Sequence, residues 1–244
     1  MIWIGAVMYK NKTFLGIIPA RSGSKGIPDK NIREINHKPL MAYTIEAGKK
    51  SGLFDQLLVS TDSELYGEIA EKYGASVPFL RPGELASDQA ATKDVILHVL
   101  KELSRQGKAF DYFMVLQPTS PLRNETHILE SADLLLKKNG DAVIGVCRTE
   151  SVSHLVVPLT ETGEIKAGFP NKQPSRRQDH PSECRINGAI YLVSANLFQT
   201  HESFYAGRTF PYFMNALDSI DIDDEFQFKI AELFLTGQAA PVLG

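Results

Sequence analysis

A glycine-rich basic loop follows the first apolar run of the chain. Arg21, Lys25 and Lys30 surround Gly23 and Gly26. Glycines let backbone N–H groups converge on an anion, and the cationic side chains offset phosphate charge. The spacing matches neither the Walker loop nor the dinucleotide-binding G-x-G-x-x-G pattern. The alternative is a solvated basic turn, and phosphate binding is the interpretation that we favour.

Asp221 and Asp223 are the second group that could do chemistry. On an extended segment, side chains at positions i and i+2 face the same side, so the two carboxylates would lie close together. Such a pair suits Mg²⁺, which keeps several waters and bridges substrate phosphates. The flanking Ile220 and Ile222 would then point into the core. The alternative is an acidic loop in which Asp223 or Asp224 only caps the last helix.

Basic and amide side chains near residue 180 form the third group: Arg177, Arg185 and Asn187, with Lys172 and Arg176 nearby. An arginine fork matches a carboxylate through two hydrogen bonds, so this group would suit an acidic substrate. Solvent-facing charges on an irregular segment are the alternative. The six histidines show no metal-ligand spacing, and no Ser-His-Asp or Cys-His arrangement can be argued.

Strand-like and helix-like patterns alternate over the first two-thirds of the chain. The apolar runs predict strands over residues 14–20, 56–60, 77–80, 112–116 and 141–146. The helical spacing of apolar residues predicts helices over residues 39–50, 63–73, 91–105 and from the cap Asn124 to Gly140. This alternation indicates a parallel sheet with helices on both faces. Ligands of such sheets bind beyond the carboxyl ends of the strands, where residues 21–31, 81–92 and 117–123 form polar loops.

The rhythm breaks between about residues 150 and 184. This stretch has scattered prolines and a basic patch, and we expect an excursion from the sheet with a short hairpin at about 155–169. Such segments often form a lid or a subunit contact. Strands are then expected at 186–193 and near 208–214, with a short helix near 195–200 between them. A final amphipathic helix would bury Phe226, Ile230 and Phe234.

Composition excludes several classes of protein. The 26 Lys and Arg residues against 29 Asp and Glu residues leave a net charge of −3, without the basic excess of nucleic-acid-binding proteins. No apolar run reaches the roughly 20 residues needed to span a bilayer. The apolar start lacks the basic residue and the cleavage site of a signal peptide, so we expect a soluble cytoplasmic protein without a membrane partner. Two cysteines, Cys147 and Cys184, are too few for a disulfide scaffold or a zinc cluster.

Six stretches resemble one family. They read IPARSGSKGIPDKN (18–31), VSTD (59–62), LRPGELASD (80–88), LQPTSPLR (116–123), RINGAIY (185–191) and DSIDID (218–223). In this order they resemble the CMP-sialic acid (acylneuraminate) synthetases, cytidylyltransferases that activate acidic nine-carbon sugars. The resemblance implies an α/β fold, a Rossmann-like three-layer nucleotidyltransferase with a mainly parallel sheet. It also implies one cytidylyltransferase domain over residues 1–244, with a dimerisation and sugar-pocket segment at about 150–184.

The resemblance also implies a role for particular residues. Positions that match the CTP-binding residues of the family are Arg21, Ser24, Lys25, Asn31, Arg81 and Thr92. Positions that match its sugar pocket are Gln117, Arg177, Arg185, Asn187 and Tyr191. Asp221 and Asp223 match its metal carboxylates, which implies Mg²⁺ as cofactor. The expected partners are CTP, an acidic sugar and a second subunit in a homodimer.

The hypothesis is nucleotidyl transfer, in which the anomeric 2-hydroxyl of the sugar attacks the α-phosphate of CTP and expels pyrophosphate. Arg21, Lys30 and Asp221 are the expected catalytic residues, because the chemistry needs positioning and charge neutralisation. Two other classes stay open: a nucleotide-sugar-dependent glycosyltransferase, which also uses Asp-x-Asp, and a non-catalytic CTP-binding regulator.

The identity of the sugar also stays open. Family members that act on N-acetylneuraminate often carry a lysine shortly after a His-Pro pair, and residues 153–158 have none. Legionaminic acid or another nonulosonic acid is therefore an alternative substrate. The stretch from Lys25 to Pro28 argues against pseudaminic acid, and the sequence Gly-Ile-Pro-Asp-Lys argues against Kdo.

Overall fold

The first strand is buried on both faces. The computed structural model describes residues 8–24, 26–148, 161 and 183–238. Within β1 (Phe14–Pro19), Phe14 and Ile18 join one hydrophobic cluster, while Leu15 and Ile17 join another on the opposite face. This alternation follows from the two-residue period of a strand. It explains why the strand reads as a continuous apolar run.

The central sheet has six strands in the order β4-β1-β5-β7-β6-β8. Its other members are β4 (Gln56–Ser60), β5 (Tyr112–Val115), β6 (Ala142–Arg148), β7 (Cys184–Ser194) and β8 (Thr209–Phe213). The strand β7 runs antiparallel to both β5 and β6, whereas the other pairs are parallel. The sheet is therefore mixed and mostly parallel. A strand that is buried on both faces reads the same in either direction, so apolar runs alone could not reveal the reversal.

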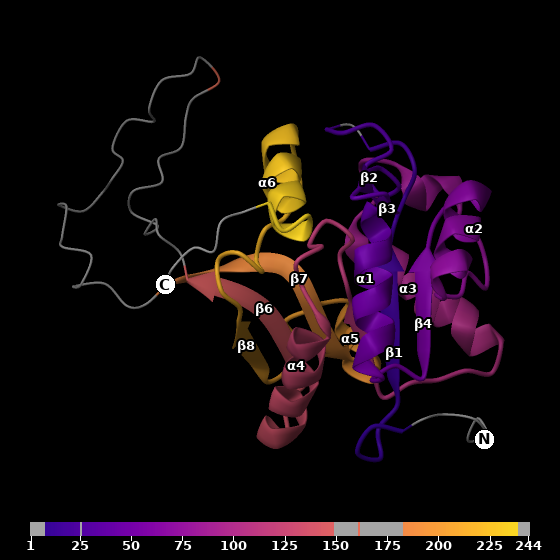
Figure 1. Cartoon of the computed structure of the whole chain (residues 1–244). Coiled ribbons are helices and arrows are strands. Elements are labelled where there is room, and N and C mark those ends of the chain that lie inside the picture. The colour runs from indigo at the N-terminus through magenta and orange to yellow at the C-terminus, as the bar shows by residue number, and fades with distance from the viewer. Residues whose placement is uncertain (1–7, 25, 149–160, 162–182, 239–244) are drawn as a thin grey trace.

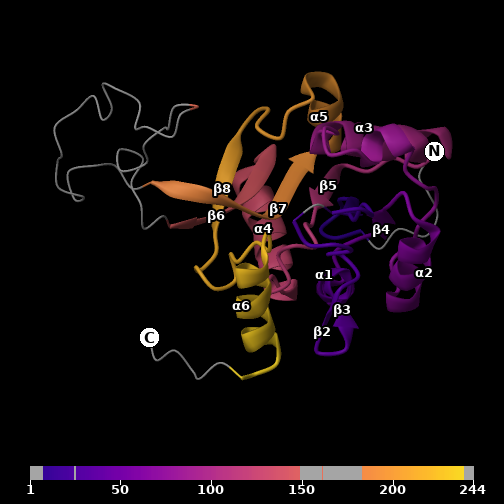
Figure 2. The same ribbon diagram turned by 90° about the horizontal axis from the view of Figure 1, so that it is seen from above.

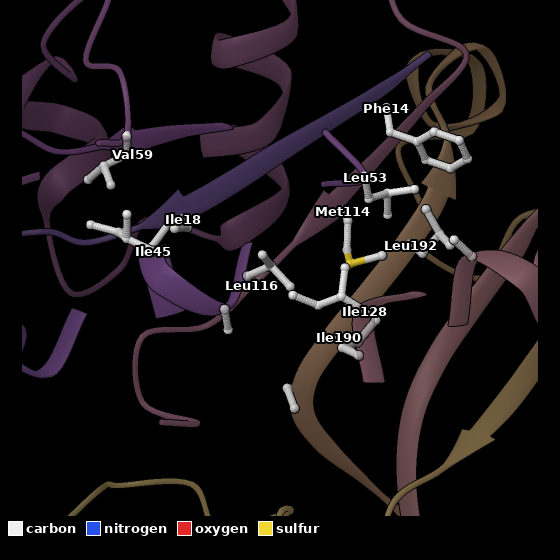
Figure 3. Packing of buried hydrophobic residues seen from close by; sticks show 14 of the residues in the cluster. Phe14, Ile18, Ile45, Leu53, Val59, Met114, Leu116, Ile128, Ile190 and Leu192 are labelled. Carbon is white, nitrogen blue, oxygen red and sulfur yellow. The ribbon is translucent and has the colours of Figure 1, made fainter. Parts of the chain in front are cut away.

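Helices cover both faces of this sheet (Figures 1 and 2). Residues of α1 (Leu40–Ser51), α2 (Glu64–Tyr73) and α4 (Glu125–Lys138) join the cluster of Phe14 and Ile18. Residues of α3 (Thr92–Arg105) and α5 (Ala195–His201) join the opposite cluster. In Figure 3, Ile45 of α1 and Ile128 of α4 lie near the sheet residues Ile18, Met114 and Leu116. The three-layer α/β fold is thereby confirmed.

The last helix, α6 (Glu225–Leu235), packs away from the sheet layers. Its buried residues Phe228 and Ala231 form a third cluster with Ile27, Ile35 and Ile222. The expected buried position of Phe226 is wrong, because this side chain is 73% exposed. Almost every second or third residue of α6 is apolar, so the sequence left the rotation of the helix undetermined. The cluster joins α6 to the basic loop and to the segment of Asp221.

Three local features differ from the expectations. Residues 77–80 form no strand; only a single bridge joins Ser76 to Leu58 there. A short 3₁₀ helix, η1 (Gly83–Ala86), lies in the expected loop. A small hairpin of β2 (Glu34–Ile35) and β3 (Lys38–Pro39) was missed. Strands of two residues carry too little periodic signal to be found from sequence.

Two expectations concern other features of the chain. The hairpin expected at 155–169 lies outside the described residues. Among the helices of the described part, none is long and apolar enough to cross a membrane.

Candidate active site

A cavity of about 360 Å³ lies at the carboxyl edge of the sheet. The three polar loops that were expected there all contribute to its wall. Of the predicted site residues, those that line it are Arg21, Ser24, Lys30, Asn31, Arg81, Thr92, Gln117 and Asp223. Residues that are up to about 200 positions apart in sequence therefore surround one space. Lys25 lies outside the described residues, as does Arg177.

The basic loop is held against the acidic segment. Lys30 Nζ donates a hydrogen bond of 2.6 Å to the carbonyl of Ile222 and lies 3.6 Å from a carboxylate oxygen of Asp223. The side chain of Asn31 is buried, and its Nδ2 donates to the carbonyl of Arg21 at 2.9 Å. A Cβ built on Gly26 would lie only 2.7 Å from the carbonyl oxygen of Asp223. The two predicted groups, one basic and one acidic, thus meet directly.

Arg21 reaches across the cavity to the segment after η1. Its Nη2 donates to Asp88 Oδ1 at 2.5 Å, and its Nη1 donates to the carbonyl of Ala86 at 3.1 Å. Asp88 also lines the cavity and had no predicted role, although it ends the LRPGELASD stretch. This ion pair and the bond to Ala86 hold the Arg21 guanidinium at the cavity wall.

Arg81 is 6% exposed, and its guanidinium is bound within the protein. Nε and Nη2 donate to the hydroxyl and the carbonyl of Ser60, and Nη1 donates to the carbonyl of Leu85. Burial lowers the pKa of Arg81 to about 10, and the nearby Asp62 acts in the opposite direction. Arg81 therefore remains charged at neutral pH and contributes a rigid, cationic part of the cavity wall.

Asp221 is largely buried behind the cavity, next to Thr119. Burial raises the pKa of the Asp221 carboxyl, and the charge of Asp223 raises it further. A hydrogen bond from the hydroxyl of Thr119 lowers this pKa, as do the charges of Lys30 and Arg185. The main chain joins the same two segments, because the amide of Ile222 donates to the carbonyl of Thr119 at 2.8 Å. Thr119 also lines the cavity, and sequence reasoning had assigned it no role.

The pair of Asp221 and Asp223 fits a divalent cation. Asp221 Oδ1 is buried and has no hydrogen-bond partner, so it is an acceptor that a cation would satisfy. Asp223, two residues further along the chain, lines the cavity with its side chain 75% exposed, and its charge acts on Asp221. Among the described residues there is no cluster of three or more potential His, Cys, Asp or Glu ligands. Two carboxylates with substrate phosphates and water are the usual ligand set of Mg²⁺.

The predicted sugar-binding residues of β7 lie next to Asp221 rather than in the wall of the cavity. Arg185 Nη2 donates to the carbonyl of Ser219 at 3.4 Å. The amide of Asn187 is 2% exposed and donates to the hydroxyl of Ser219 at 3.0 Å, so this side chain holds the segment that leads to Asp221. Tyr191 is partly buried, and this burial raises the pKa of its phenol, with smaller contributions from Tyr205 and from the charge of Asp221. The ring of Tyr191 lies 5.2 Å from that of Phe204.

A buried arginine supports the loop that contains Gln117. Arg123 is 1% exposed, and its guanidinium donates to the carbonyls of Ala189 and Gln117 and to the hydroxyl of Thr44. It thereby joins the loop after β5 to the strand β7 and to α1. Arg123 ends the LQPTSPLR stretch and had no predicted role. A single arginine after a loop gives no sign in sequence that it will be buried.

The sequence of this chain is similar to those of known cytidylyltransferases. A sequence model described as cytidylyltransferase matches residues 15–235. The chain is 38% identical over 219 residues to an N-acylneuraminate cytidylyltransferase of Escherichia coli O18:K1:H7, a match that covers 89% of this chain and 51% of that protein. It is 35% identical to a CMP-N,N'-diacetyllegionaminic acid synthase of Legionella pneumophila, with 89% and 94% covered. The chain spans about half the length of the N-acylneuraminate cytidylyltransferases that it matches.

Solved structures share the fold at low sequence identity. A CMP:2-keto-3-deoxy-manno-octonic acid synthetase in complex with CTP has a TM-score of 0.69 at 13% identity, with 93% of this chain and 100% of that chain covered. A 4-diphosphocytidyl-2C-methyl-D-erythritol synthase of Anaerococcus prevotii has a TM-score of 0.66 at 14% identity, with 92% and 99% covered. The match of the family model to most of the residues, together with relatives above 30% identity over most of both chains, shows that this chain belongs to the cytidylyltransferase family.

Proposed function

We propose that this protein transfers the cytidylyl group of CTP to an acidic nine-carbon sugar, giving the CMP-sugar and pyrophosphate. The observation that carries this proposal is the meeting of two groups at one cavity: Arg21 and Lys30 of the basic loop line it together with Asp223, and Asp221 precedes Asp223 by two residues. Nucleotidyl transfer needs cations for the triphosphate and carboxylates for a metal ion. The relatives with named activities act on sugars of this class.

The chain's own residues supply charge and orientation. Arg21 and Lys30 line the cavity from one loop and would neutralise the charge that grows on the α-phosphate and on the leaving pyrophosphate. Binding of a triphosphate would replace the contact of Arg21 with Asp88, whose carboxylate now accepts from it. The hydroxyl of Thr119 would hold Asp221 in place through its hydrogen bond. Positioning of this kind is the main source of catalysis in nucleotidyl transfer.

Asp221 and Asp223 would hold Mg²⁺. When bound there, Mg²⁺ would offset the charge of the triphosphate and lower the pKa of the attacking sugar hydroxyl. The buried, unpaired Oδ1 of Asp221 supports this assignment. Lys30, at 3.6 Å from Asp223, links the carboxylates to the phosphate side of the cavity.

The acidic sugar would lie on the side of Gln117, Arg185 and Tyr191. Gln117 lines the cavity. The charge of Arg185 lowers the pKa of Asp221, and the charge of Asp221 adds to the effect of burial in raising the pKa of Tyr191. N-acetylneuraminate or a related nonulosonic acid is the proposed substrate. The relatives named for diacetyllegionaminic acid and pseudaminic acid, at 35% and 31% identity, keep those two sugars in the test.

A homodimer is also proposed, built through the segment of residues 150–184. Two exposed apolar side chains lie on strands near this segment: Ile186 of β7, which follows the segment, is 46% exposed, and Phe213 of β8, which pairs with β6, is 55% exposed. Exposed apolar side chains of this kind often become buried in subunit interfaces. Light scattering should give twice the mass of one chain, and the mass of one chain would contradict the dimer.

Pyrophosphate release tests the proposed reaction. The purified protein is incubated with CTP and Mg²⁺, and with N-acetylneuraminate, diacetyllegionaminate, pseudaminate and Kdo in separate reactions. We expect turnover with at least one nine-carbon sugar and none without sugar. UTP in place of CTP is the nucleotide control. Binding of CTP without turnover on any of these acids would favour a regulator instead.

A further inference from the structure

The end of β4 contacts both loops that carry the predicted CTP-binding residues. The carbonyl of Ser60 accepts from the amide of Ala20 at 2.9 Å and from Nη2 of Arg81 at 2.6 Å. The carbonyl of Thr61 accepts from the amide of Arg81 at 2.7 Å. Residues 60–62 therefore join the basic loop to the segment that begins at Arg81.

Asp62 completes this junction with a charged group. Its Oδ1 accepts from the amide of Ser22 at 2.8 Å, and its Oδ2 accepts from the hydroxyl of Ser22 at 2.5 Å. Ser22 directly follows Arg21, so this carboxylate holds the first turn of the basic loop. Asp62 is not among the residues that line the cavity. It acts on the site only through the residues that it holds.

Asp62 also offsets positive charge between the two loops. Burial lowers the pKa of Arg81, the charge of Arg21 lowers it further, and the charge of Asp62 raises it. The two guanidinium groups therefore repel each other, and Asp62 compensates for that repulsion. For the Asp62 carboxyl itself, burial acts to raise the pKa, but the two hydrogen bonds from Ser22 and the charge of Arg81 outweigh it, so the pKa is lowered.

We propose that Asp62 is a positioning residue of the CTP site, which holds the start of the basic loop through Ser22 and keeps Arg21 and Arg81 together on the same side of the cavity. This proposal rests on the proposed function, since it takes CTP as the ligand. Loss of the carboxylate would let the loop and the two cations move apart. CTP binding would weaken, while sugar binding on the other side of the cavity would change little.

Asp55 provides a matched control at the opposite end of β4. Its Oδ2 accepts from the amide of Phe14 at 2.7 Å, at the start of β1, just as Asp62 accepts from the amide of Ser22 after the end of β1. Both carboxylates thus join the same two strands. Only Asp62 lies at the edge of the sheet where the cavity is found, so Asp55→Asn reports the effect of losing a carboxylate of this kind far from the site.

The test compares Asp62→Asn, Asp55→Asn and the unchanged protein. The dissociation constant of CTP is measured by calorimetry without sugar, and the KM values for CTP and sugar are measured by pyrophosphate release. For Asp62→Asn we expect the dissociation constant and the KM of CTP to rise about tenfold or more, since hydrogen bonds to a charged group are lost. The KM of the sugar should stay within about twofold. Asp55→Asn should leave CTP binding unchanged.

Several results would overturn the proposal. A folded Asp62→Asn protein that binds CTP as tightly as the unchanged protein would do so, and so would equal losses in both variants. If Asp62→Asn does not fold, the variant Ser22→Ala tests the proposal instead, since it removes only the hydroxyl that donates to Asp62. Ser22→Ala should weaken CTP binding about threefold or more. Unchanged CTP binding in this variant would count against the proposal. An unchanged protein that binds no CTP would refute the proposed function as well. Failure of turnover alone leaves the binding comparison valid.

Discussion

Gly26→Ala should separate the two halves of the active site. A Cβ at this position would lie 2.7 Å from the carbonyl oxygen of Asp223, and this oxygen belongs to the main chain, so it cannot rotate away. Ordinary van der Waals contacts start at 3.4 Å, so the basic loop and the Asp223 segment must move apart by about 0.7 Å. A misplacement near 1 Å can cost about 100-fold in rate, so we expect kcat/KM to fall about 10- to 100-fold.

Steady-state pyrophosphate release measures this effect, and thermal unfolding measures its cost in stability. The free energy of unfolding should fall by about 1 to 3 kcal/mol, because the displaced atom belongs to the main chain and the lower chain entropy of unfolded alanine offsets only part of this cost. Gly83→Ala is the matched control: no atom lies within 4 Å of a Cβ built there, so its activity should be unchanged. The two glycines belong to neighbouring loops of the same cavity.

Two results would refute this reasoning. Wild-type kcat/KM in Gly26→Ala would show that the close approach to Asp223 has no role in catalysis. An equal loss in Gly83→Ala would show that any added methyl group in these loops is harmful, whatever the space around it.

Three further predictions concern charged groups. Asp221→Asn should lower kcat by about 100-fold or more. It should also raise the Tm of the metal-free protein at neutral pH, because burial raises the pKa of Asp221 and its ionised form opposes folding. This gain in Tm should shrink as the pH falls toward the pKa of Asp221. Arg123→Lys keeps the charge but cannot reach all the acceptors of the guanidinium, so urea denaturation should show a loss of about 2 kcal/mol; an unchanged midpoint would contradict this. For Asp111, burial raises the pKa, but hydrogen bonds from Thr13 and Lys12 outweigh it and lower the pKa overall. Asp111→Asn should therefore destabilise the protein at neutral pH, with a difference in Tm that shrinks as the pH falls below about 4 and through the lowered pKa of Asp111; a difference that does not shrink there would count against this assignment.

Most of the fold could be predicted from local pattern. The apolar runs of β1 and β5 and the stripes of α3 and α4 are strong periodic signals, and Asn124 caps α4 as expected. The direction of β7 could not be predicted, because burial on both faces leaves no mark of strand direction. The rotation of α6 could not be predicted either, since Phe226 and Phe228 fit equally apolar stripes and only packing against Ile222 selects Phe228.

The site was predicted in part. Residues of the basic loop, Gln117 and Asp223 come together as expected, because parallel strands end at one edge and place their loops side by side. The supporting contacts of Asp62, Asp88 and Arg123 could not be predicted. Each depends on which neighbour lies within hydrogen-bond distance across the cavity or the sheet, and that distance is not a property of the local sequence.

The sequence by itself determined the α/β class, the order of the longer strands and helices, and the residue types needed for phosphate and metal chemistry. Those depend on composition and on periods of two and 3.6 residues, which every stretch of chain carries locally. Only the tertiary structure decided that Asp221 is buried behind Thr119 and that Lys30 bonds to the carbonyl of Ile222, 192 residues away. Side chains become buried, and residues that are distant in sequence come close together, only when the helices pack on the sheet. They set the charge and the position of each group that the proposed reaction needs.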